Sequence, residues 1–213
     1  MQTNELVEKL SANLRPVDRG IMIRTFRRAV GAGLLLAVAA VWIAFGVPLR
    51  LHDDGAVGFL ILKLLFTGSL IVFGFQALVK LARPGRRRPL IIALVGLPFL
   101  ALALSAAPGL LAGSHIWWNS AILGRTWSEC LLVIPALAIV PFALIIWAIR
   151  RGAPTSLRGA GALAGALAGA VSASAYALAC RDDSVAFVAC WYTASILLCA
   201  VTGALLGPRL LRW

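Results

Sequence analysis

Residues 130–158 read CLLVIPALAIVPFALIIWAIRRGAPTSLR, an uncharged apolar run over 130–149 that ends at Arg150 and Arg151. A helix needs about 20 apolar residues to cross roughly 30 Å of bilayer hydrocarbon, so the run predicts a transmembrane helix. Loops rich in Lys and Arg are held on the cytoplasmic side of a membrane. The arginines that follow the run, with Arg158 among them, therefore predict a cytoplasmic loop.

The pattern of that stretch repeats along the chain. We identify six apolar runs, at residues 29–49, 57–79, 90–108, 130–149, 159–179 and 185–207. They lack the short segments of alternating polarity that are typical of a membrane β-barrel. Hydrophobic residues make up 61% of the sequence and charged residues 13%, a composition that excludes an ordinary soluble domain. The predicted fold class is all-α, a polytopic membrane protein with six transmembrane helices.

The basic residues predict the orientation of these helices. The formal net charge is +12, and a charge of that size can indicate a nucleic-acid partner. Here, however, most of the 20 Lys and Arg residues lie in alternate segments between and around the runs, beginning with the N-terminal one. The positive-inside rule accounts for that charge and puts both termini in the cytoplasm. We therefore predict a multi-pass protein of the bacterial inner membrane, with the lipid bilayer as a partner and no direct contact with nucleic acid.

The N-terminal segment is polar and is predicted to lie in the cytoplasm. We separate it, as residues 1–28, from a transmembrane domain at 29–213. Its apolar side chains fall on one face of a predicted short amphipathic helix: Leu6, Val7, Leu10 and Leu14. Such a stripe needs an apolar cover, and the segment has no second helix to supply one. The stripe can dock onto a partner protein or lie on the membrane surface, and the sequence favours neither.

Glycine recurs at four-residue spacing in the fifth run, at Gly161, Gly165 and Gly169. With glycines one turn apart, one side of a helix is almost bare backbone, so another helix can approach closely. Gly203 and Gly207 repeat the arrangement in the sixth run. We expect these faces to pack inside the monomer, and a dimer interface is the second possibility.

Two cysteines are predicted to lie at similar depth. Cys130 opens the fourth run and Cys180 follows the fifth, so two antiparallel helices carry both to the exterior end of the bundle. Three interpretations stay open: a dithiol that the exterior can oxidise, a transient soft-metal site, or two inert small residues. Side chains that could supplement two thiolates in a metal site are His115, Glu129, Asp182 and Asp183. No other cofactor is predicted.

Lys63 is the only ionisable residue well inside a run, and a charge there is costly. We predict a structural ion pair, with Asp53, Glu129, Asp182 or Asp183 as partner, because no second buried carboxylate is present to relay protons. The same lysine and the exterior carboxylates would also suit a small six-span transporter or channel, which is the alternative function. Metalloprotease, phosphate-loop and nucleophile-elbow motifs are missing, so we predict that the protein is not an enzyme.

Several short stretches resemble one protein family, the negative regulators of sigma F. They are Leu62–Leu64, Gly124–Trp127, Arg150–Thr155, Tyr176–Cys180, Asp183-Ser184, Phe187-Val188 and Trp191-Tyr192. The resemblance covers nearly the whole chain. It implies a six-span inner-membrane anti-sigma factor whose N-terminal segment sequesters an extracytoplasmic-function sigma factor.

The resemblance also implies roles for individual residues. The sigma factor would bind through the N-terminal stripe, and Cys130 and Cys180 would sense external heavy-metal or oxidative stress. Members of the family often have a His immediately before the second cysteine, where this chain has Ala179; this difference favours a dithiol over a metal site. Modification of the two cysteines would shift the fourth and fifth spans and release the sigma factor.

Overall fold

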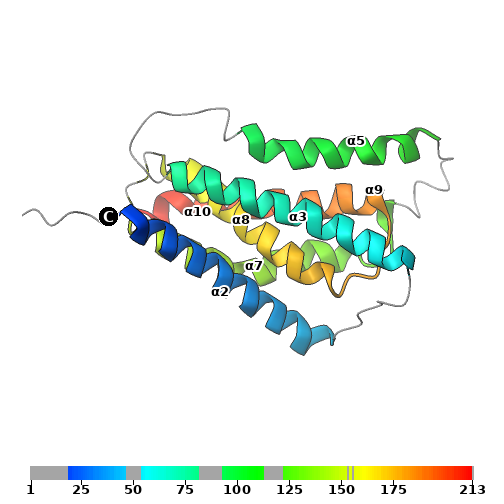
Figure 1. The fold of residues 1–213 in the computed structure, drawn as a ribbon, viewed down its shortest axis with the longest axis horizontal. Helices are drawn as coiled ribbons and strands as arrows, with labels where there is room; N and C mark the ends of the chain where they lie inside the picture. Colours follow the sequence, from blue (N-terminus) through cyan, green and yellow to red (C-terminus); the bar gives the residue numbers. More distant parts are fainter. Residues whose placement is uncertain are drawn as a thin grey trace, which may run out of the picture.

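The computed structural model describes residues 19–46, 54–81, 93–112, 122–152, 154 and 156–212. The secondary structure in these ranges is helical, with no strand (Figure 1), so the all-α prediction is confirmed for them. The stripe formed by Leu6, Val7, Leu10 and Leu14 lies outside the described residues.

The described elements are all helices or helical turns. Their bounds are α2 (Arg19–Phe45), α3 (Asp54–Leu81), the 3-10 turn η1 (Leu94–Gly96), α5 (Leu97–Ala112), α7 (Trp127–Ile149), α8 (Leu157–Ala177), α9 (Val185–Phe187), the π-helical turn η2 (Val188–Tyr192) and α10 (Thr193–Leu210).

Five helical stretches among the described residues are long and apolar enough to cross a membrane: Gly20–Phe45, Gly55–Leu81, Trp127–Ile149, Leu157–Ala177 and Val185–Leu210. The predicted third span, 90–108, corresponds to a shorter apolar helix at Leu94–Pro108. Five or six crossings are compatible with these lengths, so the count of six stays a prediction.

The first long helix begins before its apolar run. α2 starts at Arg19 and continues through a basic turn in which Arg27 and Arg28 are exposed. Phe26, in the same turn, is fully buried and packs edge-on against Phe75 of α3, with ring centroids 6.4 Å apart. Hydropathy does not detect this turn because its charged residues lower the local average, although one side of the helix is buried.

α8 is the central helix of the bundle. It packs against α2, α3, α7 and α10, and every residue from Leu167 to Ala177 is buried. Most of its side chains are Ala, Gly or Ser, so four neighbouring helices can approach its backbone. α5 lies at the margin of the bundle (Figure 1) and contacts α3, α9 and η2 instead.

α8 and α10 pack backbone against backbone along the predicted glycine face. A Cβ added at Gly161 would overlap the carbonyl oxygen of Gly203. One added at Gly165 would overlap the carbonyl oxygen of Cys199, and one at Gly169 would stand 3.1 Å from the Cys199 Cβ. The glycine face of α8 therefore lies inside the monomer, against α10.

The outward faces of the long helices carry large apolar side chains. Strongly exposed examples are Leu35 at 72%, Ile43 at 87%, Leu65 at 66%, Leu132 at 72% and Leu205 at 66%. In water, apolar surface of this extent would drive association. In a bilayer it is the surface that contacts lipid, so the pattern indicates membrane insertion.

Candidate functional site

Cys130 and Cys180 lie together at one end of the bundle, which we call the thiol end. Cys130 is in the first turn of α7, and Cys180 follows the end of α8, where the N–H groups of Ala179 and Cys180 donate to the Tyr176 carbonyl at 2.9 and 3.0 Å. Both thiols are free and buried. The two thiols lie within hydrogen-bonding reach of each other, so the fold brings the predicted pair together.

Aromatic side chains enclose the two sulfurs. Tyr176, Phe187 and Tyr192 are buried in the same apolar cluster as both cysteines. The Tyr176 hydroxyl donates to Glu129 Oε2 at 3.4 Å. The Tyr192 hydroxyl faces the Cys180 sulfur and has no nitrogen or oxygen partner within the described part of the chain. Cys130 is fully buried and Cys180 is only 9% exposed, so the pair is shielded from solvent.

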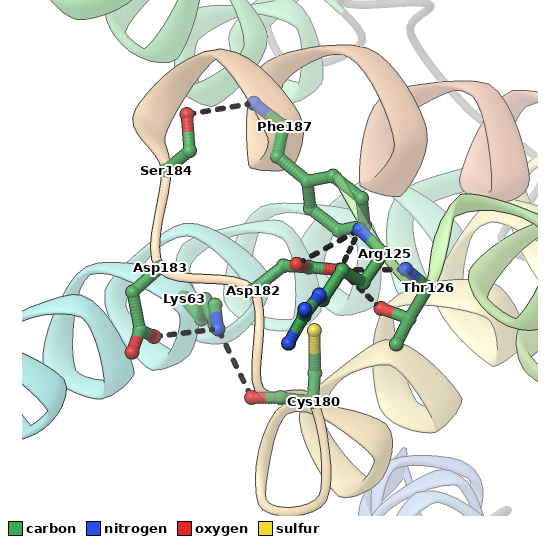
Figure 2. Close-up of polar contacts among 8 residues, drawn as sticks. All are labelled: Lys63, Arg125, Thr126, Cys180, Asp182, Asp183, Ser184 and Phe187. Carbon is green, nitrogen blue, oxygen red and sulfur yellow. Dashed lines mark hydrogen bonds and ion pairs between the residues drawn. The ribbon is translucent and has the colours of Figure 1, made fainter. Parts of the chain in front are cut away.

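Asp182 ties the segment after Cys180 to the start of α7 (Figure 2). Its carboxylate accepts hydrogen bonds from the backbone N–H groups of Arg125 and Thr126, at 3.1 and 2.8 Å, and from the Thr126 hydroxyl. The first N–H groups of a helix lack partners within it, and a negative charge there also interacts favourably with the helix dipole. Asp182 therefore caps α7 from a separate segment of the chain.

Lys63 reaches the same segment from α3 (Figure 2). Its side chain is 1% exposed, and Nζ lies 3.3 Å from the Cys180 carbonyl oxygen and 3.4 Å from Asp183 Oδ1. Of the four carboxylates that the sequence offered as partners, Asp183 forms the ion pair. A buried ammonium without a partner would cost several kcal/mol, and these two oxygens compensate it.

Hydrogen bonding and charge at the thiol end favour the thiolate form of Cys180. The hydrogen bond from Cys130 has the largest effect, and it lowers the pKa of Cys180 together with the Lys63 ammonium, the Asp182 backbone N–H and the Tyr192 hydroxyl. Burial of the sulfur opposes them. The resulting pKa of Cys180 is about 6, below the ordinary value of 9.0. Because the thiolate is the nucleophilic form, Cys180 is the more reactive thiol of the pair.

A tight turn at Gly124 brings the start of α7 to this segment. Gly124 has φ +54°, and a Cβ there would stand 2.7 Å from Phe187 Cδ2 and 3.1 Å from Asp182 Cγ. Left-handed backbone and lack of space therefore both favour glycine. Nearby, Trp191 Nε1 donates to the Ile122 carbonyl at 2.7 Å, which anchors the same loop to η2.

Arg125 and Thr126 belong to the site although the sequence interpretation assigned them no role. The available signal was Thr126 immediately before the apolar run, a residue type that often begins helices. Nothing in the sequence indicated that a carboxylate from the loop after α8 would bind there.

The other two cysteines are separate from the pair. Cys190 is exposed and Cys199 is buried in the interface of α8 with α10. Among the described residues, no group of three or more His, Cys, Asp and Glu side chains could hold a metal ion. His115 and the N-terminal stripe lie outside the described ranges.

The fold and the thiol end define a class of protein, a helical membrane protein with a shielded dithiol at one end of its bundle. The sequence model described as negative regulator of sigma F matches residues 10–213. The chain belongs to this family, whose members are regulatory anti-sigma factors and not enzymes.

Two curated relatives match over their whole length. The chain is 32% identical over 216 residues to the probable anti-sigma-F factor NrsF of Azospira oryzae. It is 31% identical over 220 residues to the anti-sigma-F factor NrsF of Caulobacter vibrioides, and both alignments cover 100% of each sequence. No solved structure matches the chain.

Proposed function

We propose that this protein is an inner-membrane anti-sigma factor. It binds a sigma factor of the extracytoplasmic-function class that corresponds to the sigma F of its relatives, and it releases this sigma factor when Cys130 and Cys180 are oxidised. Membership in the family supports the anti-sigma activity. The observation that carries the sensor is the hydrogen-bonded thiol pair at one end of the bundle. If the two cysteines served packing alone, there would be no reason for a buried ammonium beside them.

The input and the output of this sensor lie on opposite faces of the membrane in our proposal. Phe26, near the start of α2, packs in one cluster with Leu211, whereas Phe45, at the end of α2, meets Tyr176 with ring centroids 6.1 Å apart. α2 therefore spans the bundle from the end opposite the thiols, where it begins at Arg19, to the thiol end, where it ends at Phe45 (Figure 1).

The proposed topology has six spans with both termini in the cytoplasm. Residues 1–28 form the sigma-binding segment, with Leu6, Val7, Leu10 and Leu14 in contact with the sigma factor, and residues 29–213 form the sensor domain. Exposed arginines near the end opposite the thiols support this orientation, among them Arg150 and Arg209. Positive charge at that end is typical of a cytoplasmic face.

The proposed signal is an oxidant such as a peroxide. The Cys180 thiolate attacks one peroxide oxygen, the O–O bond breaks, and the other oxygen leaves as water after protonation. The Cys130 sulfur then attacks the resulting sulfenic acid of Cys180, and the hydroxide that leaves takes the proton of the Cys130 thiol. Two thiols and one hydrogen peroxide become one disulfide and two waters. The Lys63 ammonium favours a thiolate but repels a metal cation, so we propose oxidation in preference to metal capture.

α7 is the element that would transmit the change. It carries Cys130 at one end, contains Pro135 and Pro141, and packs along α2, where a Cβ added at Gly33 would stand 3.1 Å from Pro141 Cβ. Proline removes a backbone hydrogen bond and makes a helix easier to bend. A disulfide would pull the start of α7 toward Cys180, and the bend would shift α2 and the segment attached to it. Such coupling requires two bundle arrangements that differ in affinity for the sigma factor.

Co-purification tests the output. The protein with and without residues 1–20 is isolated from the membrane of its host, and bound proteins are identified by mass spectrometry. We expect a sigma factor with the full chain and none with the truncated chain. Leu10→Ser should also lose it, whereas Ala12→Ser, on the opposite side of the predicted helix, should retain it. Recovery of the sigma factor with the truncated chain would overturn the assignment of the segment.

A sigma-dependent reporter tests the input. We expect peroxide to induce the reporter in cells with the wild-type protein and in cells with Cys190→Ser, but not in cells with Cys130→Ser or Cys180→Ser. Induction that persists in the double variant would rule out the thiol sensor. Induction by cadmium but not by peroxide, lost in the same variants, would contradict the oxidation step and favour metal capture.

A further inference from the structure

We propose that Lys63 is a positioning residue of the thiol pair, which holds the segment of Cys180 in place and keeps a positive charge beside the reacting sulfur. The inference rests on the proposed thiol-sensor function and adds a third helix, α3, to the site. Nζ of Lys63 binds the Cys180 carbonyl oxygen at 3.3 Å and Asp183 Oδ1 at 3.4 Å. It therefore contacts the residue that carries the thiol and one that follows it.

Burial of a charged lysine at this position costs free energy, and the packing of the helices does not require a lysine there. The side chain is 1% exposed and is flanked in the sequence by Leu62 and Leu64. Well-packed apolar side chains are often at least as stable as a buried ion pair, and a leucine would suit this apolar run. We therefore assign the Lys63 charge a role at the groups that it contacts, the Cys180 carbonyl and the Asp183 carboxylate.

Several ionisable groups surround the Cys180 sulfur or the segment that carries it. They are Cys130 and Glu129 of α7, Tyr176 of α8, Tyr192 of η2, Lys63 of α3, and Arg125, Arg181, Asp182 and Asp183 of the loops. Among the described residues, Lys63 is the buried cation, whereas Arg125 and Arg181 are exposed and screened by water. The two loop carboxylates are held by hydrogen bonds to other groups.

The side chain of Lys63 has two consequences for the thiols. First, it anchors the loop of Cys180 to α3, while Asp182 anchors the same loop to α7. The Cys180 sulfur is thereby kept within hydrogen-bonding reach of Cys130. Second, an ammonium near a sulfur stabilises the thiolate over the thiol.

Alkylation by iodoacetamide measures both effects at Cys180. The thiolate sulfur forms a bond to the methylene carbon of the reagent, and iodide leaves with the electron pair. The full-length reduced protein in lipid nanodiscs is labelled for short times between pH 5 and pH 9, and the rate at Cys180 is read from its peptide by mass spectrometry. An opposite charge close to a group shifts its pKa by about one to three units. We therefore expect Lys63→Met to move the midpoint of the profile upward by at least about one pH unit, which lowers the rate at pH 6 about fivefold or more.

Three further variants make the result specific to the charge. Lys63→Arg keeps a cation and should restore the profile of the wild type. Lys80→Met removes a charge from the same helix but far from the thiols, near the end of α3, and should leave the profile unchanged. Lys63→Gln removes the charge but keeps amide N–H donors for the Cys180 carbonyl and Asp183, so it provides the test if Lys63→Met does not fold.

An unshifted profile in Lys63→Met, or in Lys63→Gln, would overturn the role of Lys63. That outcome would leave sigma binding untouched, because binding is measured by co-purification. Conversely, loss of the anti-sigma assignment would leave the alkylation profile as predicted.

Discussion

Replacing Gly165 by Ala tests whether the close approach of α8 and α10 stabilises the bundle. The added methyl group would overlap the carbonyl oxygen of Cys199, and the carbonyl carbon would lie 2.8 Å from it. Both atoms belong to backbone in the middle of α10, so no rotamer change can make room. The two helices would have to move apart, and contacts along their shared face would lengthen.

The expected cost follows from two opposing effects. Overpacking a close-packed interior costs about 1–3 kcal/mol, and a clash with backbone belongs at the upper end of that range. Alanine in a helix interior is more favourable than glycine by about 1 kcal/mol. The net destabilisation of Gly165→Ala is therefore about 2 kcal/mol, roughly a 30-fold change in the unfolding equilibrium.

Gly68→Ala in α3 is the matched control, because no atom lies within 4 Å of its added Cβ. We expect this variant to be as stable as the wild type or more stable. Both variants are unfolded by titration with SDS in lipid–detergent micelles, and helix content is followed by circular dichroism. A Gly165→Ala protein at least as stable as Gly68→Ala would refute the backbone contact between α8 and α10.

Three further predictions concern the thiol end. Asp182→Asn should destabilise the protein by about 2 kcal/mol in the same titration, because hydrogen bonds to a charged group contribute about 1.5–3 kcal/mol; an unchanged midpoint would contradict its capping role at Thr126. Gly124→Ala should lower stability by about 1–3 kcal/mol, since it combines a left-handed backbone with a clash against Phe187, and wild-type stability would exclude that turn. In the wild type, the alkylation rate of Cys180 should rise from pH 5 to pH 7 and level off above, because its pKa of about 6 leaves it mostly thiolate at neutral pH; a midpoint near 9 would contradict this.

The cysteine pair shows how far the sequence could lead. Both residues could be placed at the same end of the bundle by counting from the ends of their apolar runs. Whether two side chains at equal depth meet depends on the rotation of each helix about its axis. That rotation is set by packing against α8 and its neighbours, and no local pattern contains it.

The aspartates illustrate the same limit. Asp182 and Asp183 are adjacent in the sequence and looked equivalent as partners for Lys63. Their side chains point in different directions from the loop, so Asp183 binds Lys63 and Asp182 binds the start of α7 (Figure 2). The direction of each depends on the path of the loop between α8 and α9, which long-range contacts determine.

The sequence by itself determined that the chain forms long apolar helices and that its charge is arranged for a membrane, because the length and polarity of a helix are local properties. It also identified the family, since the short matching stretches run through the whole chain. Only the tertiary structure decided that the Cys130 thiol meets the Cys180 thiol, that Lys63 reaches the same segment, and that Asp182 caps α7. These contacts join residues far apart in the chain, and their geometry depends on how closely the glycines of α8 let its neighbours approach.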